Sequence, residues 1–380
     1  MNAKHIMVIA GEASGDAHAA RMIAELKQLQ ADVIVKGIGG NNMRDAGAEI
    51  IVDFSALAVM GLVEVLKRYR SIKKIFNQMV DLLKSDKPDL LVLVDYPGFN
   101  LKLAKQAKKL GIPVLYYISP KVWAWRAGRV KTIKKYVDHM AVLFPFEVPI
   151  YEEAGVPVTC VGHPLVDAVQ RKWTTKQAKT KLGIKFNRRV LGVFPGSRHS
   201  EVEALLPVML SAAARVQQQL ANVDIVLPIA QGIDTSVIDA IIAKSDVDVR
   251  VVSGNFYEIT SACDAIVAAS GTVTLEIALL GIPHFITYRV APLTYNILKQ
   301  LVKIPYVGLC NIVTAKPIVL ELLQNEVSSE RLEKELLTRL TSPESKGNAE
   351  NVCKQVRSAL GPAGGAKNMA QVVINMLAKQ

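Results

Sequence analysis

Short apolar runs recur along the chain, and stretches with helical spacing of apolar residues separate most of them. The runs are nearly continuous rather than alternating, which is typical of strands covered on both faces of a parallel sheet. Strands alternating with helices predict βαβ units, so the expected fold class is α/β with doubly wound sheets. The predicted strands cover residues 5–10, 33–36, 90–94, 114–118, 140–143, 190–194, 225–227, 249–252 and 265–268.

This pattern begins twice, which indicates two Rossmann-like domains with parallel sheets facing a central cleft. The chain has 380 residues, too many for a single domain of about 150. A polar, basic segment at residues 170–189 separates the halves, and we expect domains at 1–165 and 166–360. Residues 361–380 contain a glycine-rich turn and a last apolar helix, which a chain crossover would pack back on the first domain.

Positive charge is concentrated in one stretch of the chain. Half of all residues are hydrophobic and 21% are charged, a composition that supports a sizeable core and excludes intrinsic disorder. The net charge is +12, yet residues 67–135 alone contain 17 Lys or Arg against four Asp or Glu. Candidate partners are nucleic acid, an anionic membrane surface and phosphorylated substrates.

Metal, disulfide and acyl-enzyme chemistry find no support in the sequence. The four cysteines form no CxxC pair and the first residues lack a signal-peptide pattern, so we expect reduced, cytosolic cysteines. None of the six histidines has a partner at metal-ligand spacing, and no GxSxG motif occurs. No run of 18 apolar residues is found, so no membrane-spanning helix is expected.

Two candidate sites follow strands in the first half. Gly11–Asp16 opens a helix, where free N–H groups favour an anion, although a tight turn with Asp16 as a cap would give the same pattern. Asp95 ends an apolar run, and ligands of open α/β sheets bind outside the carboxyl ends of strands. A carboxylate there is a general base if burial raises its pKa, or else a helix cap. Gly37–Gly40 lacks the third glycine of a dinucleotide fingerprint.

Two similar loops follow strands in the second half. Pro195-Gly196-Ser197-Arg198 combines loop N–H groups with a guanidinium, as phosphate sites do. Ser270-Gly271-Thr272 repeats the arrangement, and Glu276, one turn into the next helix, could hold ribose hydroxyls. Each loop alone could be a turn with an N-cap, but two in one domain favour a nucleotide.

Residues 62–79 carry an apolar stripe at helical spacing with basic residues between. Such a stripe is more often core than membrane contact, but the basic cluster also fits a helix at a membrane surface. Downstream, Trp123 and Trp125 stand among cations and could stack on bases, lie at lipid headgroups or belong to the core. The candidate membrane contacts are Leu62, Val65, Leu66, Lys67, Arg68, Tyr69, Ile72 and Phe76.

Together these segments closely resemble the lipid-A-disaccharide synthase family, bacterial glycosyltransferases with two Rossmann-like domains of the GT-B architecture. The resemblance covers nearly the whole chain and weakens after about Glu330. Cys310 stands where some members carry proline. The matching segments are GEASGD from residue 11, AVMGLVEVL from 58, DYPGFN from 95, YYISPKVWAWR from 116, FPFE from 144, GHPL from 162, PGSRHSEV from 195, ASGTVTLE from 269 and YRVAPLT from 288.

The resemblance implies an inverting reaction. A 2,3-diacylglucosamine unit would pass from UDP-2,3-diacylglucosamine to 2,3-diacylglucosamine 1-phosphate (lipid X), giving a β-1,6 disaccharide and UDP without metal or cofactor. It implies Asp95 as the catalytic base, although Glu12 or Asp16 could itself be the base. The donor would contact Gly196, Ser197, Arg198, Ser270, Gly271, Thr272, Glu276 and Asn311, and the acceptor Glu12, Ser14, Gly15, Asp16 and Asn100.

The implied location is the cytoplasmic face of the inner membrane, with the enzyme bound peripherally. The charge of residues 67–135 is then best explained by attraction to anionic headgroups and the acceptor phosphate, at roughly 1 kcal/mol per basic residue, and no nucleic-acid partner is expected. Two alternatives stay open. One is another UDP-sugar transferase or epimerase of the same architecture, and the other is a non-catalytic membrane- or RNA-binding protein.

Overall fold

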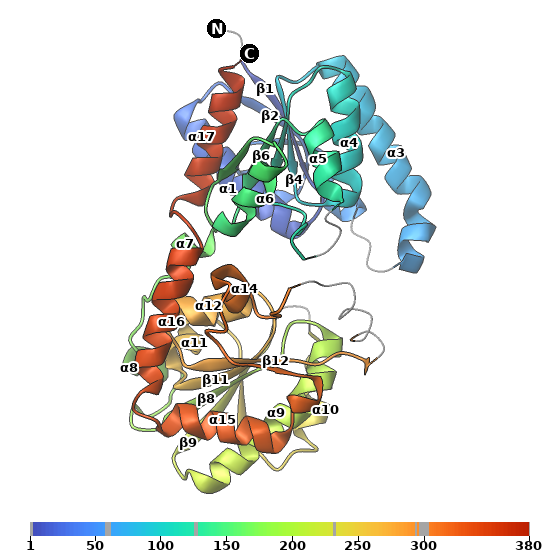
Figure 1. The fold of residues 1–380 in the computed structure, drawn as a ribbon. Helices are drawn as coiled ribbons and strands as arrows, with labels where there is room; N and C mark the ends of the chain where they lie inside the picture. Colours follow the sequence, from blue (N-terminus) through green and yellow to red (C-terminus); the bar gives the residue numbers. More distant parts are fainter. Residues whose placement is uncertain are drawn as a thin grey trace. The chain divides into compact units, whose positions relative to one another are not determined.

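The computed structural model describes residues 3–57, 62–124, 128–230, 233–292, 295 and 304–379, and the side chains of residues 62–69 lie outside the description. The chain divides into two compact units (Figure 1). Unit 1 comprises Met1–Pro164 together with Leu360–Gln380, and unit 2 comprises Leu165–Ala359. The C-terminal segment therefore belongs to the same unit as the N-terminus.

Unit 1 is built on a seven-stranded parallel sheet in the order β3-β2-β1-β4-β5-β6-β7. The central strands β1 and β4 are almost wholly buried, which explains their uninterrupted apolar sequences. The strands are β1 (His5–Ala10), β2 (Ile34–Gly39), β3 (Glu49–Asp53), β4 (Leu90–Val94), β5 (Val114–Tyr117), β6 (His139–Val142) and β7 (Val158–Cys160).

Helices cover both faces of this sheet. One face carries α1 and α17, whose apolar residues share a core cluster with β1, β2 and β4, and the two helices lie side by side (Figure 1). The other face carries α3 to α6. The helices are α1 (Ala13–Leu29), α2 (Asn41–Asp45), α3 (Leu62–Asp86), α4 (Pro97–Lys109), α5 (Arg129–Tyr136), α6 (Val148–Glu153) and α17 (Gly365–Leu377).

Unit 2 repeats the plan with a six-stranded parallel sheet in the order β10-β9-β8-β11-β12-β13. Its strands are β8 (Arg189–Phe194), β9 (Val223–Pro228), β10 (Val249–Val252), β11 (Ala265–Ala269), β12 (His284–Tyr288) and β13 (Glu321–Leu323). Its helices are α7 (Leu165–Ala168), α8 (Thr175–Lys181), α9 (His199–Gln219), α10 (Thr235–Ile242), α11 (Phe256–Ala262), α12 (Val273–Leu280), α14 (Leu309–Thr314), α15 (Ser329–Thr341) and α16 (Ser345–Ala359). The predicted α/β class with two parallel sheets is confirmed.

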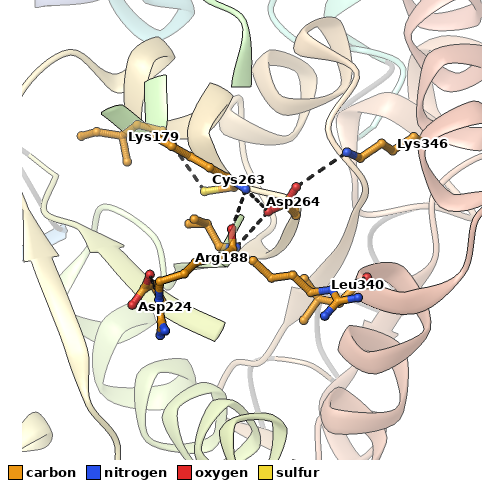
Figure 2. Close-up of polar contacts among 10 residues, drawn as sticks. Lys179, Arg188, Asp224, Cys263, Asp264, Leu340 and Lys346 are labelled. Carbon is orange, nitrogen blue, oxygen red and sulfur yellow. Dashed lines mark hydrogen bonds and ion pairs between the residues drawn. The ribbon is translucent and has the colours of Figure 1, made fainter. Parts of the chain in front are cut away.

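A buried ion pair joins elements at the amino-terminal edge of the second sheet (Figure 2). Lys179 of α8 lies with its Nζ 2.6 Å from Asp264 Oδ2, and its side chain is only 5% exposed. Asp264 directly precedes β11 and also accepts a hydrogen bond from the Val190 N–H at 2.9 Å. The Lys179 ammonium donates in addition to the Arg188 carbonyl at 2.8 Å. The pair therefore ties α8 to the starts of two adjacent strands.

Four strands, β3, β7, β12 and β13, were not predicted, and three of them are short or partly exposed. β3 and β7 are half-exposed, and β13 has three residues, so none shows the continuous apolar run of a central strand. β12 is well buried, but its His284 and Thr287 interrupt the apolar pattern. Gly37, viewed in the sequence as part of an incomplete dinucleotide motif, lies against β1. A Cβ there would be 1.9 Å from the Val8 carbonyl oxygen, so glycine is required for strand packing.

Candidate functional site

The predicted site loops lie where the strand order of each sheet reverses. In unit 1 this happens between β1 and β4, whose last residues Ala10 and Val94 are paired. In unit 2 it happens between β8 and β11, where Phe194 pairs with Ala268. Open α/β sheets bind ligands outside the carboxyl ends of strands at such a switch point. Each unit thus brings two of the predicted loops together at the edge where a ligand is expected.

Asp95 is the best-placed acid–base group in unit 1. It follows β4, and its backbone is held by three hydrogen bonds: its N–H donates to Tyr117 O at 2.9 Å, and its carbonyl accepts from Tyr116 Oη at 2.6 Å and Asn100 Nδ2 at 2.8 Å. The backbone φ angles of Asp95 and Tyr96 are both +45°, in the left-handed region that non-glycine residues rarely adopt. This anchored, strained turn fixes the direction in which the carboxylate points.

The surroundings of Asp95 raise the pKa of its carboxyl toward neutral pH. Burial raises the pKa of the carboxyl to about 6, and the negative charge of Glu12 acts in the same direction. The positive charges of Lys121 and Arg129 oppose the rise in the pKa. A carboxylate with a pKa about one unit below neutral pH is deprotonated there, yet accepts a proton more readily than an ordinary aspartate.

The residues of the Gly11–Asp16 loop have different roles in the structure. Glu12 and Ser14 are exposed, and the Ser14 hydroxyl donates to Glu12 Oε1 at 2.8 Å. Gly15 is buried beneath them. Asp16 is completely buried and accepts hydrogen bonds from the N–H groups of Gly40, Asn42 and Met43 and from the Asn42 side chain. Asp16 therefore caps α2, and Glu12 and Ser14 are the polar members of the loop that face solvent.

Asn100 is also part of the scaffold beneath the site. It is fully buried in the first turns of α4, and its amide nitrogen donates to the carbonyls of Val94 and Asp95 at 3.2 and 2.8 Å. Its Oδ1 atom is buried without a hydrogen-bond partner. Asn100 thus supports the carbonyl side of the Asp95 turn.

In unit 2, Glu201 in the first turn of α9 accepts hydrogen bonds from the loop after β8. Gly196 adopts a φ of +112°, and the N–H groups of Ser197 and Arg198 both donate to Glu201 Oε2, at 3.0 and 3.3 Å. The Arg198 guanidinium pairs with Glu201 Oε1 at 2.9 Å, while its side chain is 78% exposed. These donors are the groups that a phosphate would use, and a carboxylate of the same chain now accepts from them.

The loop after β11 lies beside the loop after β8. Ser270 donates its hydroxyl to Val307 O at 2.8 Å, whereas Thr272 is exposed at the start of α12. Glu276, one turn further, accepts from Tyr257 Oη at 3.0 Å, and burial raises the pKa of its carboxyl. Gly271 leaves open space where a side chain would stand. This loop therefore offers a hydroxyl, backbone N–H groups and a carboxylate along one helix start.

Asn311 is buried, and its side chain is hydrogen-bonded to other groups of unit 2. It is 1% exposed; its amide nitrogen donates to Val319 O and Glu321 Oε1, both at 2.7 Å, and its Oδ1 accepts from Val319 N–H at 2.9 Å. Glu321 in turn accepts from the N–H groups of Val307 and Gly308. Asn311 consequently orders the segment to which Ser270 is bonded. The neighbouring Cys310 is buried, which raises the pKa of its thiol to about 12.

The predicted membrane contacts are described only in part. Side chains of Leu62, Val65, Leu66, Lys67, Arg68 and Tyr69 lie outside the described residues. Of the remaining two, Phe76 packs edge-on against Phe99 of α4 at 5.5 Å, and Ile72 joins the same partly buried cluster. Lys73 and Lys74 are exposed on the other side of α3. No helix in the described ranges is both long and apolar enough to cross a membrane.

Sequence reasoning missed several residues around these loops. Lys121 and Arg129 influence Asp95, Tyr116 holds its carbonyl, and Tyr257 holds Glu276. Tyr116 and Lys121 belong to the YYISPKVWAWR segment of the resemblance, but nothing in the sequence assigns them to Asp95, and Arg129 and Tyr257 carry no such signal. Across the residues that the structure describes, no three His, Cys, Asp or Glu side chains gather in a way that could hold a metal ion.

The fold and its two switch-point sites define a two-unit protein of the GT-B class. Solved structures with this fold include a putative UDP-N-acetylglucosamine 2-epimerase from Listeria monocytogenes (11% identity, TM-score 0.63, 98% and 95% of the two chains). Another is MurG from Acinetobacter baumannii (17% identity, TM-score 0.58, 99% and 100% of the two chains). The family model described as lipid-A-disaccharide synthetase matches residues 6–374.

Two curated relatives match this chain over nearly the whole length of both sequences. The lipid-A-disaccharide synthase of Geobacter sulfurreducens is 45% identical over 380 residues, 100% of this chain and 99% of the relative. The enzyme of the same name from Coxiella burnetii is 40% identical over 377 residues, 99% and 100% of the two chains. The chain belongs to the lipid-A-disaccharide synthase family, and the resemblance drawn from its motifs is confirmed.

Proposed function

We propose that the chain transfers 2,3-diacylglucosamine from its UDP conjugate to 2,3-diacylglucosamine 1-phosphate, forming the β-1,6-linked disaccharide and UDP. Family membership supports the reaction, and one structural observation supports the chemistry. That observation is a carboxyl of raised pKa, Asp95, at the switch point of one sheet, with two anion-binding loops at the switch point of the other. An acid–base group and a diphosphate site are the two elements that a metal-independent sugar transfer needs.

Asp95 acts as the general base in this proposal. Its carboxylate takes the proton from the acceptor 6-hydroxyl as that oxygen attacks the anomeric carbon of the donor. The bond between the anomeric carbon and the diphosphate oxygen breaks on the opposite side, its electron pair leaves with UDP, and the configuration inverts. Asp16 is a poor alternative because its oxygens already accept four hydrogen bonds. Glu12 lies close enough to raise the Asp95 pKa and, with Ser14, belongs to the acceptor side.

The loops of unit 2 hold the UDP. Arg198 and the N–H groups of the loop after β8 stabilise the charge that develops on the leaving diphosphate, and the start of α12 with Thr272 adds further donors. Glu201 must turn away for the loop N–H groups to reach the diphosphate, because it now accepts from both of them. Glu276 takes the ribose hydroxyls. Asn311 and Ser270 order this site from within.

The acceptor and the membrane are recognised through the positive charge of unit 1. Exposed Lys73 and Lys74 on α3, with the basic residues that precede them, attract anionic headgroups and the acceptor phosphate at about 1 kcal/mol per basic residue. The enzyme is then peripheral on the cytoplasmic face of the inner membrane. Replacing Lys67, Arg68, Lys73 and Lys74 with Gln should release the protein from anionic vesicles.

An equal loss of charge elsewhere is the matched control for that experiment. Lys176, Lys185, Lys334 and Lys354 are exposed in unit 2, and their replacement with Gln should leave vesicle sedimentation nearly unchanged. Equal effects of the two quadruple variants would show that only net charge matters, and would remove the role proposed for α3.

The reaction itself is tested by UDP release. The proposal requires release with UDP-2,3-diacylglucosamine only when the diacylated acceptor is present. Turnover of unacylated UDP-N-acetylglucosamine at a comparable rate would instead indicate another UDP-sugar transferase or an epimerase, the activity named for one neighbour of the same fold. Binding of oligonucleotides with steep salt dependence, without UDP release, would indicate an RNA-binding protein.

A further inference from the structure

A second buried carboxylate, Glu147, lies in unit 1 and has no part in the reaction as described so far. It ends the short helical turn Pro145–Glu147 after β6 and is 2% exposed. Its Oε1 accepts from the indole N–H of Trp123 at 3.1 Å, and its Oε2 accepts from the Phe144 N–H at 3.3 Å. A buried charge is costly unless its partners compensate, so its position calls for an explanation.

The partner of Glu147 belongs to the loop that follows β5. Residues 118–124 are attached to the segment 144–151 at two points. Trp123 bonds to Glu147 and packs edge-on against Phe146 at 5.4 Å, and the Ser119 hydroxyl shares a 2.7 Å hydrogen bond with the hydroxyl of Tyr151, which is fully buried. Lys121 lies between these two attachment points. Its position along the loop is therefore determined from both sides.

This loop is strained, and the strain is concentrated next to Asp95. Ile118 and Lys121 have φ angles of +70° and +45°, and Asp95 and Tyr96 have φ angles of +45°. These are four of the seven non-glycine residues with positive φ in the described part of the chain. A β-branched residue such as Ile118 adopts this conformation only where its surroundings impose it. The attachments at Ser119 and Trp123 supply that constraint.

We propose that Glu147 is a positioning residue for the transfer reaction: by holding Trp123 it keeps the strained loop 118–124 in the conformation that presents the Lys121 ammonium to Asp95. This inference rests on Asp95 as the base. Lys121 is exposed, and its charge lowers the pKa of Asp95, so it limits the rise that burial and Glu12 cause. The positive charge of Arg129, in α5, also lowers the pKa of Asp95. Loss of the Glu147 contact would let Lys121 move away.

The contact between Glu147 and Trp123 has its own signal, independent of Asp95. Burial raises the pKa of Glu147 to about 7, so the indole N–H resonance of Trp123 should titrate with a midpoint near pH 7. Asp95, which faces the loop through Lys121, ionises about one pH unit lower, with a pKa of about 6. Burial raises the pKa values of Tyr151 and Cys160 and lowers that of His163 to about 4. Glu147→Gln should abolish the titration of this resonance, which Trp123→Phe assigns.

The functional test compares Trp123→Phe, Lys121→Met and their combination. Glu147, with a pKa of about 7, is itself largely protonated on the acidic limb, so Glu147→Gln would only mimic the form already present there. Trp123→Phe keeps the ring against Phe146 and removes the N–H donor to Glu147 at every pH. The acidic limb of the kcat/KM profile should move up by about 0.5 pH units in each single variant, because a base without its cation has a higher pKa. The double variant should move no further, since both changes remove the same interaction. The donor KM should stay within about twofold, because the donor loops lie in unit 2.

Two outcomes overturn the proposal. One is an acidic limb that stays in place in folded Trp123→Phe, and the other is a shift that adds to that of Lys121→Met. If Trp123→Phe does not fold, the titration of the Trp123 resonance in the unaltered chain, and its loss in Glu147→Gln, decide whether the two side chains are in contact. An acidic limb that persists in Asp95→Asn would refute the base assignment instead, and the Trp123 resonance would still decide whether Glu147 holds the loop.

Discussion

The ion pair between Lys179 and Asp264 gives the sharpest stability prediction for unit 2 (Figure 2). Lys179→Met keeps the length of the aliphatic chain and removes the ammonium. Asp264 then loses a partner at 2.6 Å, and the Arg188 carbonyl loses a donor at 2.8 Å. Asp264 keeps its hydrogen bond from the Val190 N–H at 2.9 Å and the ammonium of Lys346 at 3.7 Å, whose side chain is 75% exposed.

The magnitude follows from distance and burial. At 2.6 Å and an effective dielectric constant of about 20, the Coulomb attraction of the pair is about 6 kcal/mol, and the desolvation of both ions offsets much of it. Removing one partner leaves the other charge buried, which typically costs about 3–5 kcal/mol. The contacts that Asp264 keeps place the expected loss of unfolding free energy at about 3 kcal/mol.

Lys181, on the same helix α8, is the matched control. It pairs with Glu258 at 2.9 Å, but its side chain is 53% exposed, and its ammonium lies 5.4 Å from the centre of the Trp173 ring. Lys181→Met should cost less than about 1.5 kcal/mol, because exposed pairs and exposed cation–π contacts are weak. Urea unfolding followed by the ¹⁹F signal of 5-fluorotryptophan at Trp173 reports on unit 2. Equal losses in the two variants would refute the reasoning from burial.

Three further predictions concern the reaction. Burial raises the Asp95 pKa to about 6, and the base acts in its deprotonated form, so kcat/KM should be constant above pH 7 and fall about tenfold per pH unit below pH 6. A profile that is flat down to pH 5 would exclude Asp95 as the base. Arg198→Met should lower kcat about 10²–10³-fold, and Arg198→Lys should restore part of the loss. Unchanged turnover in Arg198→Met would show that the guanidinium does not stabilise the leaving group. Prolonged dialysis against EDTA should leave the rate of UDP release unchanged, because N–H groups and a guanidinium compensate the charge of the diphosphate. A loss of activity that Mg²⁺ restores would contradict this prediction.

The architecture was readable from the sequence because central parallel strands carry an unmistakable pattern. β1, β4 and β8 are buried on both faces and stand out as continuous apolar runs. Edge strands such as β3 and β13 do not, because one side of each is exposed or the strand is very short. The strand order and the switch points emerge only from the pairing of distant strands, which local pattern does not encode.

The candidate site was partly predictable for a similar reason. Residues that follow central strands, such as Asp95 and Ser270, could be found by position alone. Whether such a residue faces solvent or the scaffold depends on neighbours far away in the sequence. Asp16 caps a helix 25 residues further on, and Asn311 bonds to Glu321, so both serve the scaffold. Glu147 is the converse case: it stands in the FPFE segment of the resemblance, but its partner Trp123 lies in a loop that follows another strand and cannot be inferred from the sequence.

The account depends most directly on Asp95 as the base of the transfer. The decisive measurement is the single-turnover rate of UDP release with the diacylated donor and acceptor, for Asp95→Asn and for Glu12→Gln beside the unaltered chain. We predict a fall of about 10²–10⁴-fold in Asp95→Asn with unchanged donor affinity and thermal unfolding, and a fall of less than about tenfold in Glu12→Gln. A near-normal rate in folded Asp95→Asn, or the larger loss in Glu12→Gln, would contradict the account.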